Sequence, residues 1–274
     1  MGVFDGDAMI GYSSAAHKPL AEGVHRVVVS GGVRPDRRRQ GLGTELLAAG
    51  IAAARVLHAD HHPGLELAVD VQNNALNDGA RACYDRAGMT PVRWYSHLRH
   101  PLGDAVVDVP MPGGCVVEGY GADNDAEFLA VRNESYADRW AGVPMPSEQW
   151  RALLGWPAFR PAHSFLARDT GSGAAAGVLL TFSWDADARA AGVRDAQVMT
   201  IGTLRAHRGR GIASALISRA LRSVRDDGYD GAGVEVDAGS PSAVHGLYER
   251  AGFALSRTEV RYTLEDRPAD RRPG

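Results

Sequence analysis

Cysteine is scarce in this 274-residue chain, and its two copies, Cys83 and Cys115, lie in no spacing typical of a metal site or a disulfide framework. A protein of the reducing cytoplasm is therefore expected. An excess of positive charge is also lacking, because the formal net charge is −3. Without a global basic field, no nucleic-acid partner is expected, and any recognition of phosphate must be local.

Long hydrophobic runs are missing as well. No apolar run approaches the ~18 residues that a membrane-spanning helix needs, and Met1–Asp7 lacks the basic region and apolar core of a signal peptide. We therefore expect a cytoplasmic protein without a membrane partner. The hydrophobic content of 45% and the charged content of 23% are ordinary for a globular protein of one or two domains.

Two stretches rich in arginine and glycine each follow an apolar extended run and open an amphipathic helix. They are Arg38-Arg39-Gln40-Gly41-Leu42-Gly43-Thr44 and Arg208-Gly209-Arg210-Gly211-Ile212-Ala213-Ser214. A glycine-rich turn at a helix N-terminus points backbone N–H groups outward, and the arginines add positive charge, which suits the phosphates of an anionic cofactor. No Gly-Lys-Ser/Thr follows either loop, which excludes a P-loop NTPase, and Leu46 stands where a dinucleotide-binding fingerprint has its third glycine.

The elements predicted around the two loops repeat in the same order. In the first half, hydrophobic periodicity predicts a hairpin over 3–12, a strand over 25–29, a helix over 42–57, a strand over 65–71, a helix over 77–87 and a strand over 94–98. In the second half it predicts a strand over 115–117, helices over 125–136 and 147–154 (with Ser147 as an N-cap), strands over 164–167, 176–182 and 197–204, a helix over 212–224, a strand over 234–237, a helix over 240–251 and a strand over 257–264. Leu67–Asp70 matches Val234–Asp237, and Cys83–Met89 matches Leu247–Phe253, which indicates a tandem duplication.

A stretch punctuated by proline and glycine divides the two halves. We expect a truncated first domain over 1–100, a linker over 101–114, a complete second domain over 115–265 and a disordered tail over 266–274. The first half has room only for a hairpin before its loop. It therefore lacks an opening strand-helix-helix, unless the natural chain begins upstream of Met1.

The pattern Arg-x-x-Gly-x-Gly/Ala after a strand, with a tyrosine before a Gly-Met or Gly-Phe turn, resembles the GNAT superfamily of acyl-CoA-dependent N-acetyltransferases, here as a tandem pair. The resemblance implies an α/β (α+β) fold with two GNAT-like domains, each a mixed, mostly antiparallel sheet flanked by helices, with a splayed parallel strand pair. It implies an enzyme that moves acetyl from acetyl-CoA to a primary amine of a small molecule by direct attack, without a metal, as a monomer or homodimer. The alternative is a non-catalytic or regulatory acyl-CoA-binding protein whose sites have decayed.

The resemblance also implies roles for particular residues. The pantetheine arm would enter the gap beside the strand before each loop, at Gly31, Gly32 and Val33 and at Ile201, Gly202 and Thr203. A backbone N–H of that strand would polarise the thioester carbonyl. The pyrophosphate would lie on the loops Arg38–Thr44 and Arg208–Ser214. Tyr84 and Tyr248 would protonate the departing thiolate, and Asn77 would contact the pantetheine, whereas Pro241 stands at its position in the second half.

The general base stays open, because the strand before each loop carries no acid at the expected place. The candidates are Glu235, Asp237, Asp195 and His163 in the second half and Glu22 and His25 in the first. The first half has the cleaner cofactor motif, but the second has the helices that would form the acceptor pocket. Catalysis needs both cofactor and a positioned amine, so we expect acyl transfer in the second half.

Some side chains have two interpretations. Trp140, Trp150 and Trp156 either line the acceptor pocket or belong to the core. His58, His61 and His62 fit C-terminal helix capping better than metal binding. Cys83 fits helix packing better than nucleophilic catalysis.

Overall fold

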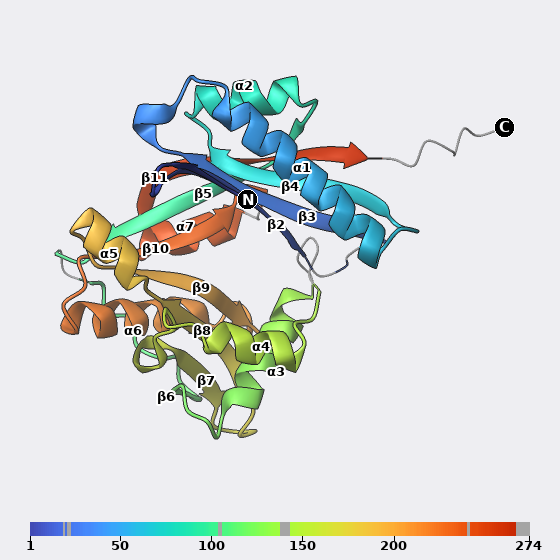
Figure 1. Cartoon of the computed structure of the whole chain (residues 1–274). Helices are drawn as coiled ribbons and strands as arrows, with labels where there is room; N and C mark the ends of the chain where they lie inside the picture. The colour runs from blue at the N-terminus through green and yellow to red at the C-terminus, as the bar shows by residue number, and fades with distance from the viewer. Residues whose placement is uncertain (19, 21–22, 104–105, 138–142, 240–241, 267–274) are drawn as a thin grey trace. The chain divides into compact units, whose positions relative to one another are not determined.

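The computed structural model describes residues 1–18, 20, 23–103, 106–137, 143–239 and 242–266. The chain forms two compact units, Met1–Tyr95 with Arg257–Gly274, and Ser96–Ser256 (Figure 1). Strand β5 (Thr90–Pro101) contributes to both, up to Tyr95 to the first unit and from Ser96 to the second.

The first unit is a mixed sheet with two helices. Its strands β1 (Gly2–Asp5), β2 (Ala8–His17), β3 (Val24–Val33) and β4 (Glu66–Asn74) lie side by side in that order. The next strand is β11 (Ala254–Asp266), from the far end of the chain, drawn red in Figure 1. It runs antiparallel to β4, with Glu259 opposite Asn74 and Asp266 opposite Leu67. Only β3 and β4 form a parallel pair among the registers described for this unit.

Helices α1 (Leu42–His61) and α2 (Asp78–Arg86) belong to this unit. The buried face of α1, with Leu47, Ile51 and Ala54, packs on valines of β3 and β4. A glycine is needed at Gly50 because a Cβ there would lie 2.4 Å from Val29 Cγ1. By length and apolar composition α1 is one described helix that could cross a membrane, which the sequence analysis did not predict. Its buried residues pack in the core cluster of the first unit.

The second unit has helices on both faces of its sheet. Strands β10 (Gly231–Asp237), β9 (Asp195–Thr203), β8 (Ala175–Phe182), β7 (Phe165–Asp169) and β6 (Cys115–Gly119) follow in that order, and only β9 and β10 are parallel among the described registers. Helices α6 (Ile212–Asp226) and α7 (Ser242–Arg250) contribute to one core cluster, and α3 (Asp125–Tyr136) and α4 (Ser147–Leu154) to another. A short α5 (Asp185–Ala191) completes the unit.

The structure confirms the predicted fold class, with a splayed parallel strand pair in each repeat. Helix α5 was missed because Asp185–Ala191 has no stripe of large apolar residues. Ser147 was wrongly expected as an N-cap: it is the first helical residue, Pro146 holds the cap position, and no side chain caps that end. The domain boundaries 1–100 and 115–265 stay a prediction about the repeats, since the compact units are not continuous stretches of chain. Residues 267–274 of the expected tail lie outside the described residues.

One predicted match between the repeats is wrong in register. Leu67 lies near the start of its parallel ladder, opposite His25, whereas Val234 is the last residue of its own ladder, opposite Val198. Matching Leu67–Asp70 with Val234–Asp237 therefore joins different parts of the two strands. Strand periodicity alone does not reveal such a shift, because a slip of an even number of residues preserves the alternation.

Candidate functional site

Each unit contains a parallel strand pair that separates partway along its length. In the first unit, pairing between β3 and β4 ends at Val28 opposite Asp70, although β3 continues to Val33 and stays paired with β2. In the second, pairing between β9 and β10 ends at Val198 opposite Val234, although β9 continues to Thr203 beside β8. Beyond the last pair, β3 no longer pairs with β4 and β9 no longer pairs with β10, which leaves a wedge-shaped gap between the two strands. Backbone N–H groups that face this gap are outside the parallel ladder and can serve a ligand.

The arginine-glycine loops have the same geometry in both repeats. Arg38 Nε donates to the Val33 carbonyl at 3.2 Å, and Arg208 Nε donates to the Thr203 carbonyl at 3.1 Å. Gly41 (φ 88°) and Gly211 (φ 89°) then turn the chain through left-handed backbone into α1 and α6. Glycine adopts this conformation without steric cost, which explains its place in both motifs. Each loop thus ends at a helix N-terminus, where unpaired N–H groups favour an anion.

In the first unit, the split and the loop border a cavity of about 700 Å³. Most of the residues predicted for this half line it, namely Gly31, Gly32, Val33, Arg38, Arg39, Gly41, Gly43, Thr44, Asn77 and Tyr84. Gln40 and Leu42, which were also predicted, do not line it. The lining also includes residues that were not predicted as ligand contacts, among them Val71, Asn73, Cys83 and Arg86. Cys83 also packs with the cluster around α1, in keeping with the packing role expected for it.

Tyr84 is 9% exposed and belongs to a chain of side-chain hydrogen bonds. Its hydroxyl accepts from Asn73 Nδ2 at 3.1 Å, and Asn73 Oδ1 accepts from Asn77 Nδ2 at 3.0 Å. Asn77 in turn caps α2, because its Oδ1 accepts from the Ala80 N–H at 3.1 Å. Burial raises the pKa of Tyr84, since it disfavours the phenolate. The side chain therefore keeps its proton at neutral pH and can donate it.

In the second unit, the last turn of α3 packs against the split. The Ile201 N–H donates to the Tyr136 hydroxyl at 3.3 Å. A Cβ on Gly202 would lie 2.0 Å from Ser135 Oγ, so only glycine allows α3 this close. Strand β9 also carries an extra residue here, because Thr200 lies opposite Leu180 and Val198 opposite Thr181, which leaves Met199 as a bulge. Bulges re-aim neighbouring backbone groups and often lie beside active sites.

The second loop is more strongly tied to its own unit than the first. Arg210, at the position of Gln40, forms an ion pair with Asp169 at 3.2 Å. The pKa of Asp169 falls to about 2, because the Ser172 backbone N–H and the Arg210 guanidinium stabilise the carboxylate. Of the other predicted residues, Ile212 is buried in the core with α6, whereas Gly209 and Gly211 are exposed and Ala213 and Ser214 are half-buried. Tyr248 is 3% exposed and packs edge-on against Phe253.

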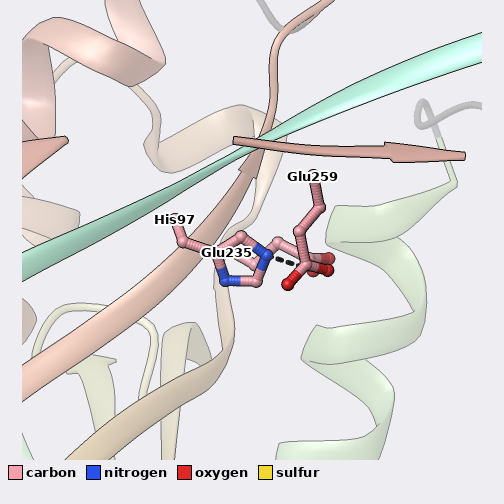
Figure 2. Close-up of side chains that lie close together, drawn as sticks. All are labelled: His97, Glu235 and Glu259. Carbon is pink, nitrogen blue, oxygen red and sulfur yellow. Dashed lines mark ion pairs between the residues drawn. The ribbon is translucent and has the colours of Figure 1, made fainter. Parts of the chain in front are cut away.

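The structure separates the candidate bases. Asp195 is held by Arg99 through two hydrogen bonds of 2.7 and 2.8 Å. His163 lies between Ser223 and Asp227, and His25 lies fully buried between His17 and His58. These three serve structural contacts, whereas Glu235 remains exposed on β10 with His97 Nε2 at 3.3 Å (Figure 2). Glu22 lies outside the described residues.

The structure decides between the two interpretations for some of the tryptophan and histidine side chains. Trp150 is a core residue, 1% exposed, whose Nε1 donates to Asp125. Trp156 is about half exposed, and Trp140 and Pro241 lie outside the described residues. His61 Nδ1 lies 3.0 Å from the Leu57 carbonyl in the last turn of α1, which agrees with helix capping. His58 instead faces His25.

The chain matches the model of the Acetyltransferase (GNAT) family over residues 1–89 and 127–253, one segment in each repeat. It is similar to the mycothiol acetyltransferase of Tsukamurella paurometabola, with 33% identity over 84% of this chain and 75% of the relative, and to that of Salinispora tropica, with 32% identity over 91% and 76%.

Among solved structures, a GCN5-related N-acetyltransferase from Sphaerobacter thermophilus has a TM-score of 0.76 at 22% identity, covering 95% of this chain and 78% of its own. A tandem GNAT protein from the clavulanic acid biosynthesis pathway has a TM-score of 0.67 at 18% identity, covering 98% and 83%. At these identities the two structures bear on the fold alone. The family-model match and the sequence relatives show that the chain belongs to the GNAT family and is a tandem N-acetyltransferase.

Proposed function

We propose that this enzyme transfers acetyl from acetyl-CoA to a primary amine of a small molecule, with the cofactor bound in each repeat and acyl transfer in the second unit. The observation that supports cofactor binding most directly is the cavity of about 700 Å³ in the first unit. It brings together the strand split, the arginine-glycine loop and a buried tyrosine, three features that lie up to 53 positions apart in the sequence, from Gly31 to Tyr84. A cavity of this size suits a cofactor-sized ligand.

The loops would hold the pyrophosphate at the N-termini of α1 and α6, with Arg38 and Arg208 fixed toward their strands by the carbonyls of Val33 and Thr203. Acetyl-CoA supplies the thioester carbon that the amine attacks. The Ile201 N–H, at the split of the second unit, would stabilise negative charge on the carbonyl oxygen. Tyr248 would give its proton to the departing thiolate.

The assignment of acyl transfer to the second unit rests on α3 and α4. These helices cover one face of that unit's sheet, and the end of α3 reaches the split at Ile201 and Gly202. The residues that line the cavity of the first unit come instead from β2, β3, β4, α1, α2 and the loops between them. Reaction requires an amine held next to the thioester, which α3 and α4 would provide.

The acceptor is proposed from the relatives. Several proteins that are 32–33% identical to this chain are named mycothiol acetyltransferases. We therefore propose a mycothiol-related amine as the first acceptor to test, beside amino sugars and amino acids as other primary amines. A purely cofactor-binding protein is the second candidate. It is favoured by β9, whose acid Asp195 is held by Arg99, and by Tyr136 at the Ile201 N–H.

Two double variants, one for each arginine-glycine loop, test this proposal. Arg38→Ala with Gly41→Val alters the first loop, and Arg208→Ala with Gly211→Val alters the second, since valine is strained at φ near 90°. Calorimetry counts acetyl-CoA sites, and release of free thiol measures turnover on the amine panel. We expect each pair to remove one cofactor site and only the second pair to abolish turnover. Loss of turnover in the first pair alone would contradict the assignment, and no turnover by the wild-type chain on any amine would favour the cofactor-binding protein.

A further inference from the structure

Half of the histidines in the chain gather at one end of the first unit. Of the ten, five come together from the end of β2, the start of β3 and the end of α1, namely His17, His25, His58, His61 and His62. We propose that this cluster binds one divalent transition-metal ion such as Zn²⁺, with His17, His25 and His61 as its ligands. The site is separate from the proposed cofactor cavity, whose described lining contains none of the five.

His25 is the centre of the cluster and is fully buried. Its Nε2 lies 3.0 Å from His17 Nδ1, and its Nδ1 lies 3.0 Å from His58 Nδ1. Two nitrogens that bind one zinc ion at about 2.0–2.1 Å stand roughly 3.3 Å apart in a tetrahedral site. Each pair therefore has nearly the spacing of two ligands of one ion, and a metal can take the place of the hydrogen that the pair shares.

The second nitrogen of each ring indicates which atoms would bind the ion. A metal-bound histidine usually donates its other N–H to a nearby acceptor, which fixes the orientation of the ring. His61 Nδ1 lies 3.0 Å from the Leu57 carbonyl, and this contact leaves Nε2 for an ion. His25 has the same arrangement in the tautomer that donates from Nδ1 to His58 and leaves Nε2 for the ion. We therefore assign His58 as a positioning residue for His25.

His17 lies between the other two ligands. Its Nδ1 faces His25, and its ring centroid lies 4.6 Å from that of His61, in an edge-on arrangement. Binding through Nδ1 places the hydrogen of the His17 ring on Nε2, so a neutral cluster need not release a proton. The site then has three imidazole ligands, and a water can take the fourth position of a tetrahedral ion.

His61 has to turn before it can join the pair. In the metal-free arrangement its nitrogen does not yet lie with those of His17 and His25 around one point. Both His17 and His61 are exposed, so rotation of their side chains disturbs no core packing. The same exposure gives an ion access from solvent to the buried His25.

The alternative is a cluster that only packs. Buried polar side chains usually bond to backbone, hydroxyl or carboxylate groups, as His163 does with Ser223 and Asp227. Among the described residues, the hydrogen-bond partners of His25 are imidazoles, and a further imidazole, that of His62, packs edge-on against it at 4.6 Å. Imidazole nitrogen suits zinc, copper and nickel ions, so the composition of the cluster favours a metal.

The test uses the full chain without a histidine tag, after removal of metal with EDTA. Calorimetry with Zn²⁺ should show a saturable site, and Co²⁺ should develop the visible absorption of a tetrahedral ion. Because the ion would join β2, β3 and α1 in the folded unit, Zn²⁺ at 100 times its Kd should raise the unfolding temperature by about 5–10 °C.

Variants of the cluster identify the ligands. His17→Asn and His61→Asn change exposed side chains, so both should fold, and each should weaken the Zn²⁺ affinity of this site about 100-fold or more. His58→Ala should weaken it about 10- to 100-fold, and His58→Gln, which keeps a hydrogen-bond acceptor, should recover part of the loss. His245→Asn, on α7 of the second unit, is the matched control and should bind Zn²⁺ as the wild type does.

The outcomes separate the parts of the proposal. Absence of Zn²⁺ binding by the wild type, or unchanged affinity in His17→Asn and His61→Asn, would overturn the metal site. A loss in His58→Ala as large as in His61→Asn, without recovery in His58→Gln, would overturn the positioning role and make His58 a ligand. These measurements need neither cofactor nor acceptor, so their result is independent of the proposed function.

Discussion

The two repeats share a cofactor motif but differ in what meets the strand split. In the first unit the split opens into a cavity bordered by Gly31, Gly32 and Tyr84. In the second, Tyr136 and Ser135 from α3 lie against the equivalent strand. Under the proposed function, the loop and the split of each repeat would hold the cofactor, whereas a helix from earlier in the second repeat would decide what else can reach the thioester.

Substituting Tyr248 and Tyr84, one in each repeat, should give the largest difference between the two units. Tyr248→Phe removes the proposed proton donor of the second unit, so we expect kcat to fall about 100-fold or more. Tyr84→Phe removes only the hydroxyl that accepts from Asn73, and turnover should change less than about threefold. Steady-state kinetics on both variants decide the matter, and the reverse order of effects would move catalysis to the first unit.

The paired glycines on the split strands should differ strongly in stability. A Cβ at Gly202 would lie 2.0 Å from Ser135 Oγ and 2.8 Å from Ser135 Cβ, so Gly202→Ala should reduce the free energy of unfolding by about 2–3 kcal/mol. At Gly32 the nearest atom is Tyr12 Cε1 at an ordinary 3.6 Å, so Gly32→Ala should cost less than about 1 kcal/mol. Denaturant unfolding measures both, and similar losses would mean that α3 does not pack on the split in solution.

Acid should weaken the first unit more than the second. His25 is fully buried beside His17 and His58, with His61 and His62 nearby, and burial with these neighbours lowers its pKa from 6.5 to about 4. The unfolded chain therefore binds a proton at His25 between about pH 6.5 and 4 that the folded unit does not. The contribution of neutral His25 to stability is fully present above pH 6.5, and the free energy of unfolding should fall by about 2 kcal/mol by pH 5 and by about 3 kcal/mol by pH 4.

Thermal unfolding at pH 7.5 and pH 5 measures this loss. His25→Gln, which does not titrate, should reduce the pH dependence of the first unit, and His245→Gln on α7 of the second unit is the matched control. An unchanged pH dependence in His25→Gln would show that another group carries it.

The smallest expected effect concerns Tyr136. Its hydroxyl accepts the Ile201 N–H that would otherwise bind an acyl oxygen. Tyr136→Phe removes this competitor. Since one such hydrogen bond contributes about 0.5–1.5 kcal/mol, acetyl-CoA should bind the second unit about 2- to 13-fold more tightly. Calorimetry should show no change at the first site. Weaker binding at the second site would instead give Tyr136 a direct role in holding the ligand.

Local features of the site were predictable from the sequence. Glycines in a helix-opening loop, an asparagine cap and a tyrosine before a glycine turn all depend on neighbours within a few residues, and Asn77 does cap α2. The groups that complete the site come from distant elements. Nothing in the local sequence of Ser135 and Tyr136 places them against β9, and the bulge at Met199 depends on the register with β8.

The local sequence also does not predict which strands pair with one another. The periodicity of 257–264 predicts a strand, but hydrogen bonding to β4 depends on which edge is open after the rest has folded. The same limit explains the wrong match of Leu67 with Val234, since alternation alone does not determine register.

The pairing of β4 with β11 has a consequence for the order of biosynthesis. Gln72 and Glu259 are hydrogen-bonded across a separation of 187 residues, so a ribosome must make the second repeat before the first can complete its sheet. Until then the edge of β4 is a bare row of backbone donors and acceptors, open to pairing with other nascent chains. A stop codon or a frameshift just before the codons of β11 would therefore damage the first unit as well as the second.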